Sequence, residues 1–208
     1  MDPQLTFSFF VAAVLLAFMP GPDNIFVLTE SITKGQRNGI ALSCGLSSGV
    51  MVHTLAVATG VSFILQSSAL AFQVVKYLGA AYLFYLAVMA MKEKKQVVTF
   101  EASEGGQFNF WKLYRQGFLM NVLNPKVSLF FIALLPQFVT EGGITVSVQL
   151  VILGGIFMLT ALVIFSLIAI LSGRLSSYLN NDRFWIWTKY GKVAVLALLG
   201  TMLLFTKK

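Results

Sequence analysis

Charged residues and cysteine are scarce in this sequence, and each scarcity excludes a class of protein. Only 11% of the 208 residues are charged, against about 25% in ordinary soluble domains. An intrinsically disordered chain is excluded, because disorder requires high charge together with low hydrophobicity. The one cysteine, Cys44, excludes an internal disulfide and a cysteine-rich metal motif. We expect Cys44 to be a small packing residue, since serine and glycine surround it.

Hydrophobic residues, in contrast, make up 57% of the chain, and the mean hydropathy is +0.81. A soluble fold of this length leaves roughly a third of its unfolded surface exposed to water, so it has no room to hide so many apolar side chains. A transmembrane helix needs about 20 apolar residues, which leaves space for about six. The alternating segments of a membrane β-barrel are absent from the sequence. The composition therefore predicts an all-α integral membrane protein.

Six long apolar runs locate the predicted membrane-spanning helices. They cover residues 5–31, 39–65, 69–91, 113–139, 144–171 and 190–205. Eleven of the 15 lysines and arginines lie in the first, third and fifth connections or at their edges. Because cytoplasmic loops are rich in lysine and arginine, we expect these connections in the cytoplasm and both termini on the periplasmic side. The net charge of +7 is spread over short patches without a basic face, which excludes nucleic acid as a partner.

The chain divides into two similar halves, residues 1–91 and 111–208, joined by a polar cytoplasmic linker at 92–110. Each half has three predicted spans, and the first span of each contains proline near its middle. The third spans begin alike, with Lys76-Tyr77-Leu78-Gly79 in one half and Lys189-Tyr190-Gly191 in the other. An odd number of spans makes the second half enter the membrane from the opposite side. We therefore predict two inverted three-helix repeats, an arrangement that many secondary transporters share.

The prolines predict that the first and fourth spans are broken helices. The two sequences are Met19-Pro20-Gly21-Pro22-Asp23-Asn24 and Asn121-Val122-Leu123-Asn124-Pro125-Lys126. Proline removes a hydrogen-bond donor and clashes with the carbonyl one turn earlier, so we expect breaks at Pro20, Pro22 and Pro125. In hydrocarbon such a break survives only against protein or a watery cavity. The N-terminal end of a half-helix suits a carboxylate, and two breaks at matching depth favour a binding site over two structural kinks.

Asp23 and Lys126 occupy matching positions directly after proline in the two breaks. A charged group at membrane depth is costly and is expected to face the bundle interior and to pair. In one hypothesis the two form an ion pair with each other, and in a second they hold the ammonium and carboxylate of a zwitterionic substrate. A permanent structural salt bridge is the alternative to both. Asn24, Asn121 and Asn124 add neutral donors and acceptors, as substrate contacts or as helix caps.

His53 is the only histidine and lies near the middle of the second predicted span. Histidine changes charge near neutral pH, which suits a proton relay together with Asp23. A single interhelical hydrogen bond is the alternative. One histidine and one cysteine are too few for a transition-metal site, and no glycine-rich nucleotide motif is present. We therefore expect no metal, no cofactor and no direct use of ATP.

These motifs resemble those of the lysine exporter and homoserine-threonine resistance (LysE/RhtB-type) family. The resemblance is carried by residues 19–24 with Lys34-Gly35 and Arg37-Asn38-Gly39, by residues 121–126 with Pro136-Gln137-Phe138, and by residues 76–83. It implies a bacterial inner-membrane exporter of amino acids or close derivatives, driven by the proton gradient, with neutral substrates such as homoserine, threonine or leucine favoured. The family's Gly-Pro and Asn-Pro-Lys positions carry over to Gly21, Pro22, Asn124, Pro125 and Lys126. The roles of Asp23, Asn24 and His53 rest on the physical reasoning above.

The resulting prediction is a secondary transporter that alternates access by proton antiport. Its expected partners are an amino acid, protons and the lipid bilayer, and homodimerisation is compatible with so small a bundle. A passive channel or ion exporter and a membrane assembly subunit remain alternatives. An enzyme is not expected, because the spans contain no nucleophile–base pair or metal cluster.

Overall fold

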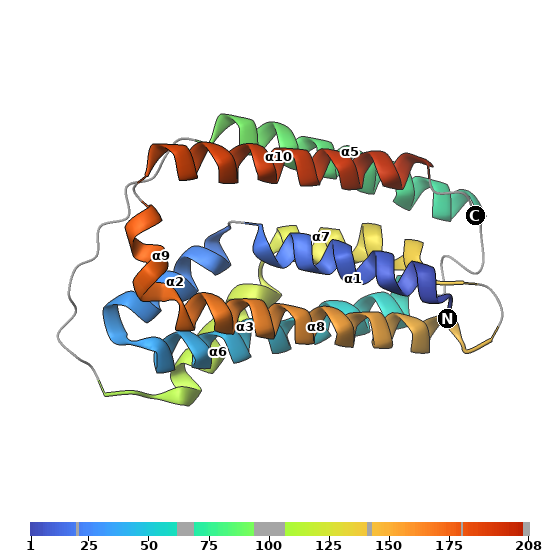
Figure 1. Ribbon diagram of the computed structural model, residues 1–208. Helices are drawn as coiled ribbons and strands as arrows, with labels where there is room; N and C mark the ends of the chain where they lie inside the picture. The colour runs from blue at the N-terminus through green and yellow to red at the C-terminus, as the bar shows by residue number, and fades with distance from the viewer. Residues whose placement is uncertain (20, 62–68, 94–106, 141–142, 180, 206–208) are drawn as a thin grey trace.

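The computed structural model describes residues 1–19, 21–61, 69–93, 107–140, 143–179 and 181–205, and within these ranges the chain is helical without a strand. The elements are α1 (Pro3–Phe18), α2 (Pro22–Lys34), α3 (Gln36–Ala56), the π-helix η1 (Val57–Val61), α5 (Ala69–Lys92), α6 (Phe110–Val122), α7 (Pro125–Leu134), the 3-10 helix η2 (Leu135–Phe138), α8 (Val146–Ile170), α9 (Ser172–Leu179) and α10 (Asp182–Phe205). They form an elongated bundle (Figure 1). The predicted all-α fold is confirmed. Most of the predicted linker lies outside the described residues, and the division into two halves stays a prediction.

The number of long apolar helices agrees with the six predicted spans. Four described helices are each long and apolar enough to cross a membrane. Two bent pairs, α1 with α2 and α6 with α7, pass the same test when each pair is taken together. These pairs coincide with the first and fourth predicted spans, so the described residues provide up to six spans.

The last span starts earlier than its apolar run predicts. α10 begins at Asp182, well before residue 190, and the short helix α9 that precedes it was not predicted. The Asn181 side chain accepts hydrogen bonds from the backbone N–H groups of Arg183, at 2.9 Å, and Phe184, at 3.3 Å. This cap satisfies the first turn of α10. Hydropathy does not detect it, because a helix extends past its apolar part when its charged residues face water.

The helix α3 packs on both α6 and α8. Glycine permits the close approach of α3 and α6. A Cβ atom at Gly49 would lie 2.8 Å from the Cβ atom of Asn121, and a Cβ atom at Gly117 would lie 2.9 Å from the backbone nitrogen of Leu46. α1 and α2 pack on α8, whereas α5 and α10 pack against each other as a separate pair. This α5–α10 pair touches the rest of the bundle mainly through α7 (Figure 1).

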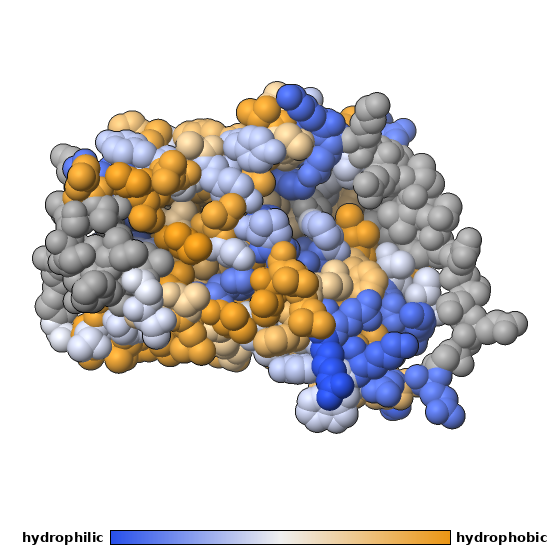
Figure 2. All heavy atoms as spheres, turned by 180° about the vertical axis from the view of Figure 1, so that it is seen from behind, coloured by the Kyte–Doolittle hydropathy of each residue, from blue (hydrophilic) through white to orange (hydrophobic). Residues whose placement is uncertain are grey.

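The two ends of the bundle differ in charge. α1 begins and α10 ends at one end (Figure 1). Basic residues mark the opposite end, where Lys34 ends α2, Lys92 ends α5 and Lys112 lies in the first turn of α6. Figure 2 shows hydrophilic residues concentrated toward one end, while apolar residues cover much of the remaining face. An apolar surface of this extent is typical of contact with lipid.

Replacing Gly117 with leucine should destabilise the protein, because the backbone of α3 occupies the space that the new side chain needs. Overpacking of a close-packed site costs about 1–3 kcal/mol. We expect a lower midpoint of thermal unfolding in detergent. The matched control is Gly155→Leu on α8, since no heavy atom lies within 4 Å of a Cβ atom built there. Equal losses in the two variants would contradict the proposed packing.

Candidate functional site

The first and fourth spans are broken at the predicted positions. α1 ends at Phe18 and α2 begins at Pro22, with 56° between their axes. Pro20, which we also predicted as a break, lies outside the described residues. α6 ends at Val122 and α7 begins at Pro125, with 55° between their axes. Pro22 and Pro125 each open a helix, where the missing N–H group costs nothing because helix starts leave that group unpaired.

Side chains near the breaks satisfy the backbone groups that the breaks release. Asn24 Nδ2 donates to the carbonyl of Ala17 near the end of α1, at 2.9 Å. Asn124 caps α7, because its Oδ1 accepts a hydrogen bond from the Lys126 backbone N–H at 3.1 Å. The carbonyl of Asn121 would bond residue 125 in a continuous helix, but proline has no N–H to donate, and the Asn124 backbone N–H bonds it instead at 2.9 Å. His53 Nε2 lies 3.1 Å from the same carbonyl and is a second donor to it, so His53 makes the interhelical hydrogen bond that was one of its two predicted roles.

The two charged groups each reach toward the opposite break. Asp23 accepts hydrogen bonds from Asn124 Nδ2, at 3.4 Å to Oδ1 and 3.2 Å to Oδ2. The Lys126 ammonium lies 3.6 Å from the position that a Cβ atom on Gly21 would take. When Pro22 is aligned with Pro125, Gly21 is the counterpart of Asn124, so the two contacts are reciprocal.

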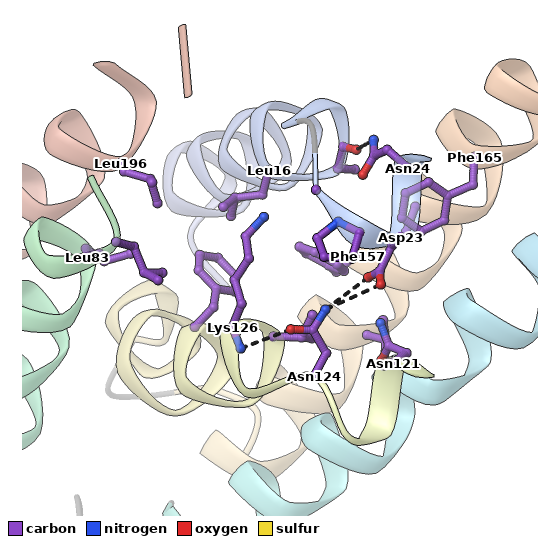
Figure 3. Close-up of a pocket in the computed structure, with 18 residues that line it drawn as sticks. Leu16, Asp23, Asn24, Leu83, Asn121, Asn124, Lys126, Phe157, Phe165 and Leu196 are labelled. Atoms are coloured by element: carbon purple, nitrogen blue, oxygen red, sulfur yellow. Dashed lines mark hydrogen bonds between the residues drawn. The ribbon is translucent and has the colours of Figure 1, made fainter. Parts of the chain in front are cut away.

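Asp23 and Lys126 do not pair with each other, although both belong to the described residues. Figure 3 shows the Lys126 side chain directed toward Leu16 and not toward Asp23, while the Asn124 amide bonds the Asp23 carboxylate. A direct ion pair, the first of the hypotheses, is therefore not formed in this conformation. The geometry leaves a separate cation and a separate anion in one place.

A pocket surrounds these groups and is lined by both broken spans, α3, α5, α8 and α10. Its polar groups come from the breaks, and its apolar wall includes Val50, Leu83, Phe157 and Leu196 (Figure 3). Asn121 Oδ1 is buried and accepts no hydrogen bond from the described residues. It faces α3, 3.0 Å from the position that a Cβ atom on Gly49 would take.

Most of the predicted site residues line this single pocket. They are Gly21, Pro22, Asp23, Asn24, Asn121, Asn124 and Lys126. Pro125 and His53 do not line it, and His53 instead contacts the backbone of Asn121. Sequence reasoning missed the apolar lining. Leu83 and Leu196 were detectable, because each follows its repeated Lys-Tyr pair at the same spacing. Phe157 carries no such signal.

No metal-like cluster accompanies the pocket. Across the ranges that the structure describes, no three His, Cys, Asp or Glu side chains come together. The chemistry of the site therefore consists of one carboxylate, one ammonium, three side-chain amides and an apolar wall. Such a set is suited to binding and orienting a small charged molecule.

Comparison with known proteins gives a consistent result. A family model described as LysE type translocator matches residues 14–207. An uncharacterized membrane protein of Pseudomonas aeruginosa is 31% identical over 84% of this chain and 82% of its own length. An uncharacterized membrane protein of Bacillus subtilis is 28% identical over 83% of this chain and 85% of its own. A homoserine/homoserine lactone efflux protein of Salmonella typhimurium is 27% identical over 85% and 84%. No solved structure matches the chain significantly.

Replacing His53 with leucine removes the side-chain donor to the Asn121 carbonyl. We expect a loss of about 1 kcal/mol in stability, the usual contribution of one hydrogen bond, measured by thermal unfolding in detergent. His53→Gln is the matched variant, because its amide nitrogen can donate from a similar place and should retain most of the stability. If glutamine destabilises the protein as much as leucine does, this hydrogen bond does not support the break.

Proposed function

The chain belongs to the LysE type translocator family, and from this we propose that it exports neutral amino acids or close derivatives across the bacterial inner membrane. Members of the family are transporters, so the chain is a membrane transporter and not an enzyme, as the sequence predicted. The homoserine/homoserine lactone efflux protein among its relatives supports a small amino-acid-like substrate.

The observation that carries the proposal is the pair of unlike charges held apart in one pocket. An α-amino acid presents an ammonium and a carboxylate a few ångströms apart. Its ammonium fits the Asp23 carboxylate, and its carboxylate fits the Lys126 ammonium. Each charge of the substrate then gains an opposite charge in the protein, which compensates for the water that it loses on entry. An ion buried in an apolar site requires such compensation.

The apolar wall favours neutral side chains. Leu83, Phe157 and Leu196 contribute no polar group to the pocket. Its two charged residues are already paired with the α-ammonium and the α-carboxylate of the substrate. A third charge on the substrate would be buried without a partner, at a cost of several kcal/mol. Homoserine, threonine and leucine each avoid this cost, whereas lysine and glutamate do not.

Asp23 is the residue best placed for proton coupling. A proton on its carboxylate removes the charge that attracts the substrate ammonium, which promotes release and gives antiport. His53 remains a candidate for the relay, but its hydrogen bond to Asn121 accounts for its presence without one. Alternating access between two broken spans would carry the site from one side of the membrane to the other.

The distribution of basic residues supports an orientation with both ends of the chain on the periplasmic side. Lys34, Lys92 and Lys112 lie at the end of the bundle opposite the start of α1. Since the cytoplasmic side of an inner-membrane protein is enriched in lysine and arginine, this end faces the cytoplasm.

Transport by proteoliposomes tests the proposed function. Vesicles containing the protein are equilibrated with a mixture of labelled amino acids at equal concentration inside and outside, and a pH gradient is imposed. We expect neutral amino acids to leave against their gradient, and a protonophore to abolish this movement. A flux that runs only downhill and ignores the pH gradient would indicate a passive channel. No flux of any amino acid would refute the proposal.

Lys126→Met should reduce export at least about tenfold, because the substrate carboxylate loses a charge-assisted contact of about 1.5–3 kcal/mol. Asp23→Asn should do the same through the ammonium. The matched control is Lys112→Met, which removes an exposed lysine at the start of α6 and should leave export unchanged. Full activity of Asp23→Asn would remove the carboxylate from the mechanism.

A further inference from the structure

α5 and α7 pack closely through two small residues, Gly79 on α5 and Ala133 on α7. A Cβ atom at Gly79 would lie 3.2 Å from the Cα atom of Ala133, which is tighter than ordinary packing. Gly79 stands about one turn before Leu83, which lines the pocket, and Ala133 stands about two turns after Lys126. This contact therefore brings α5 and α7 together on the side of the pocket toward the end of the bundle where α1 begins.

The repeat identifies the counterpart of this contact at the other end. The alignment of Pro22 with Pro125 places Glu30 on Ala133. The alignment of Lys76 with Lys189 places Lys192 on Gly79. If the two halves are equivalent, a contact between Glu30 and Lys192 should seal the pocket toward the basic end.

The α5–α10 pair supports the second alignment. Lys76 Nζ donates to the carbonyl of Leu204 near the end of α10, at 3.3 Å, and Lys189 Nζ donates to the carbonyl of Glu93 just past α5, at 3.0 Å. Each aligned lysine thus reaches the terminal turn of the other helix. Leu83 and Leu196, aligned in the same way, both line the pocket (Figure 3).

In this structure the contact between Glu30 and Lys192 is not made. Glu30 pairs with Lys34 on α2, at 3.0 Å, and Lys192 pairs with Glu93, at 2.5 Å. α10 packs on α5 and only slightly on α1. Gly79 and Ala133 are therefore in contact on one side of the pocket, whereas their counterparts Glu30 and Lys192 are not in contact on the other.

The burial of the four charged side chains shows which of them depends on a partner. Glu30 and Lys192 are 8% and 12% exposed, whereas Lys34 and Glu93 are 39% and 43% exposed. The exposed members of the two pairs can exchange their partner for water, because surface ion pairs contribute little. The buried members cannot, since a buried charge needs a compensating one.

We propose that Glu30 and Lys192 form the cytoplasmic gate, leaving Lys34 and Glu93 and pairing with each other when the pocket opens outward. This rests on the proposed function as an exporter. The exchange keeps both buried charges compensated and releases the two exposed ones to water, so neither conformation is strongly favoured. Alternating access requires such a balance between two states.

Charge reversal tests the gate. Glu30→Lys and Lys192→Glu should each reduce export at least about tenfold, because like charges then face each other in the closed gate. Combining both changes with Lys34→Glu and Glu93→Lys should recover export to near the wild-type rate, normalised to folded protein in the membrane, because opposite charges then face each other in both conformations. If this fourfold variant exports no better than the poorer single variant while the wild type is active, the gate is overturned.

The matched control is the double variant Lys192→Glu with Glu93→Lys. It rebuilds the ion pair visible between α5 and α10, but it leaves two carboxylates facing each other in the proposed gate. We expect its stability to return while its export stays low. Recovery of export in this variant would show that Lys192 acts only as a link between α5 and α10, and would overturn the proposal.

A cross-linking experiment is independent of transport. Glu30→Cys and Lys192→Cys are introduced into a Cys44→Ser background, and oxidation in membranes should join them, as seen by mass spectrometry of the peptides. Reduction should restore export where the variant is active. If no cross-link forms, the gate is wrong. If the cross-link forms but the wild type moves no amino acid, the proposed function fails and the gate stands.

Discussion

Water is absent from the centre of a bilayer, so every backbone group that a helix break releases needs a partner within the protein. The two breaks of this chain obey that constraint with a few polar side chains. Asn24 bonds the end of α1, Asn124 caps α7, and His53 bonds the carbonyl that Pro125 cannot. Asn24 and Asn124 line the pocket together with residues at the starts of α2 and α7. Because the broken backbone needs hydrogen-bond partners, polar side chains lie near the middle of the membrane, which is the depth at which transporters bind their substrates.

The charges in the pocket follow a second electrostatic rule. Asp23 and Lys126 lie in one cavity without pairing, and each reaches toward the break of the other half. If the two side chains were bonded to each other, both charges would already be compensated, and neither would be available to bind a substrate. Because they are not bonded to each other, both stay available to opposite charges on a bound molecule. The same rule underlies the proposed gate. The buried charges of Glu30 and Lys192 always require an opposite charge nearby, whereas their exposed partners Lys34 and Glu93 can be solvated by water.

The contact between Gly79 and Ala133 and the proposed contact between Glu30 and Lys192 differ in chemistry, and they lie toward opposite ends of the bundle. Gly79 meets Ala133 through backbone and methyl contact, which has no alternative partner and closes tightly. Glu30 and Lys192 have alternative partners in Lys34 and Glu93. In the proposed gate an ionic contact closes the basic end, from which an exporter takes up its substrate. Charged groups there also attract a zwitterion before it reaches the pocket.

Several features of the structure were predictable from the sequence, and they share a local cause. Hydropathy predicts the apolar helices, because burial in lipid depends on composition over some 20 residues. Proline predicts both breaks, since a missing N–H and a steric clash act within one turn. Basic residues predict the charged end. The start of α10 was missed, because the cap by Asn181 is a single side chain outside the apolar run.

Only the tertiary structure decided how these parts meet. The sequence places Asp23 and Lys126 at matching depth, but it does not determine whether they pair, because that depends on how α2 and α7 are turned and on where Asn124 lies. It shows His53 in a span, but the hydrogen bond to Asn121 follows from the close packing of α3 on α6. The apolar wall from α8 likewise appears only in the fold. Composition and proline act along the chain, whereas pairing and pocket lining depend on contacts between residues far apart in it.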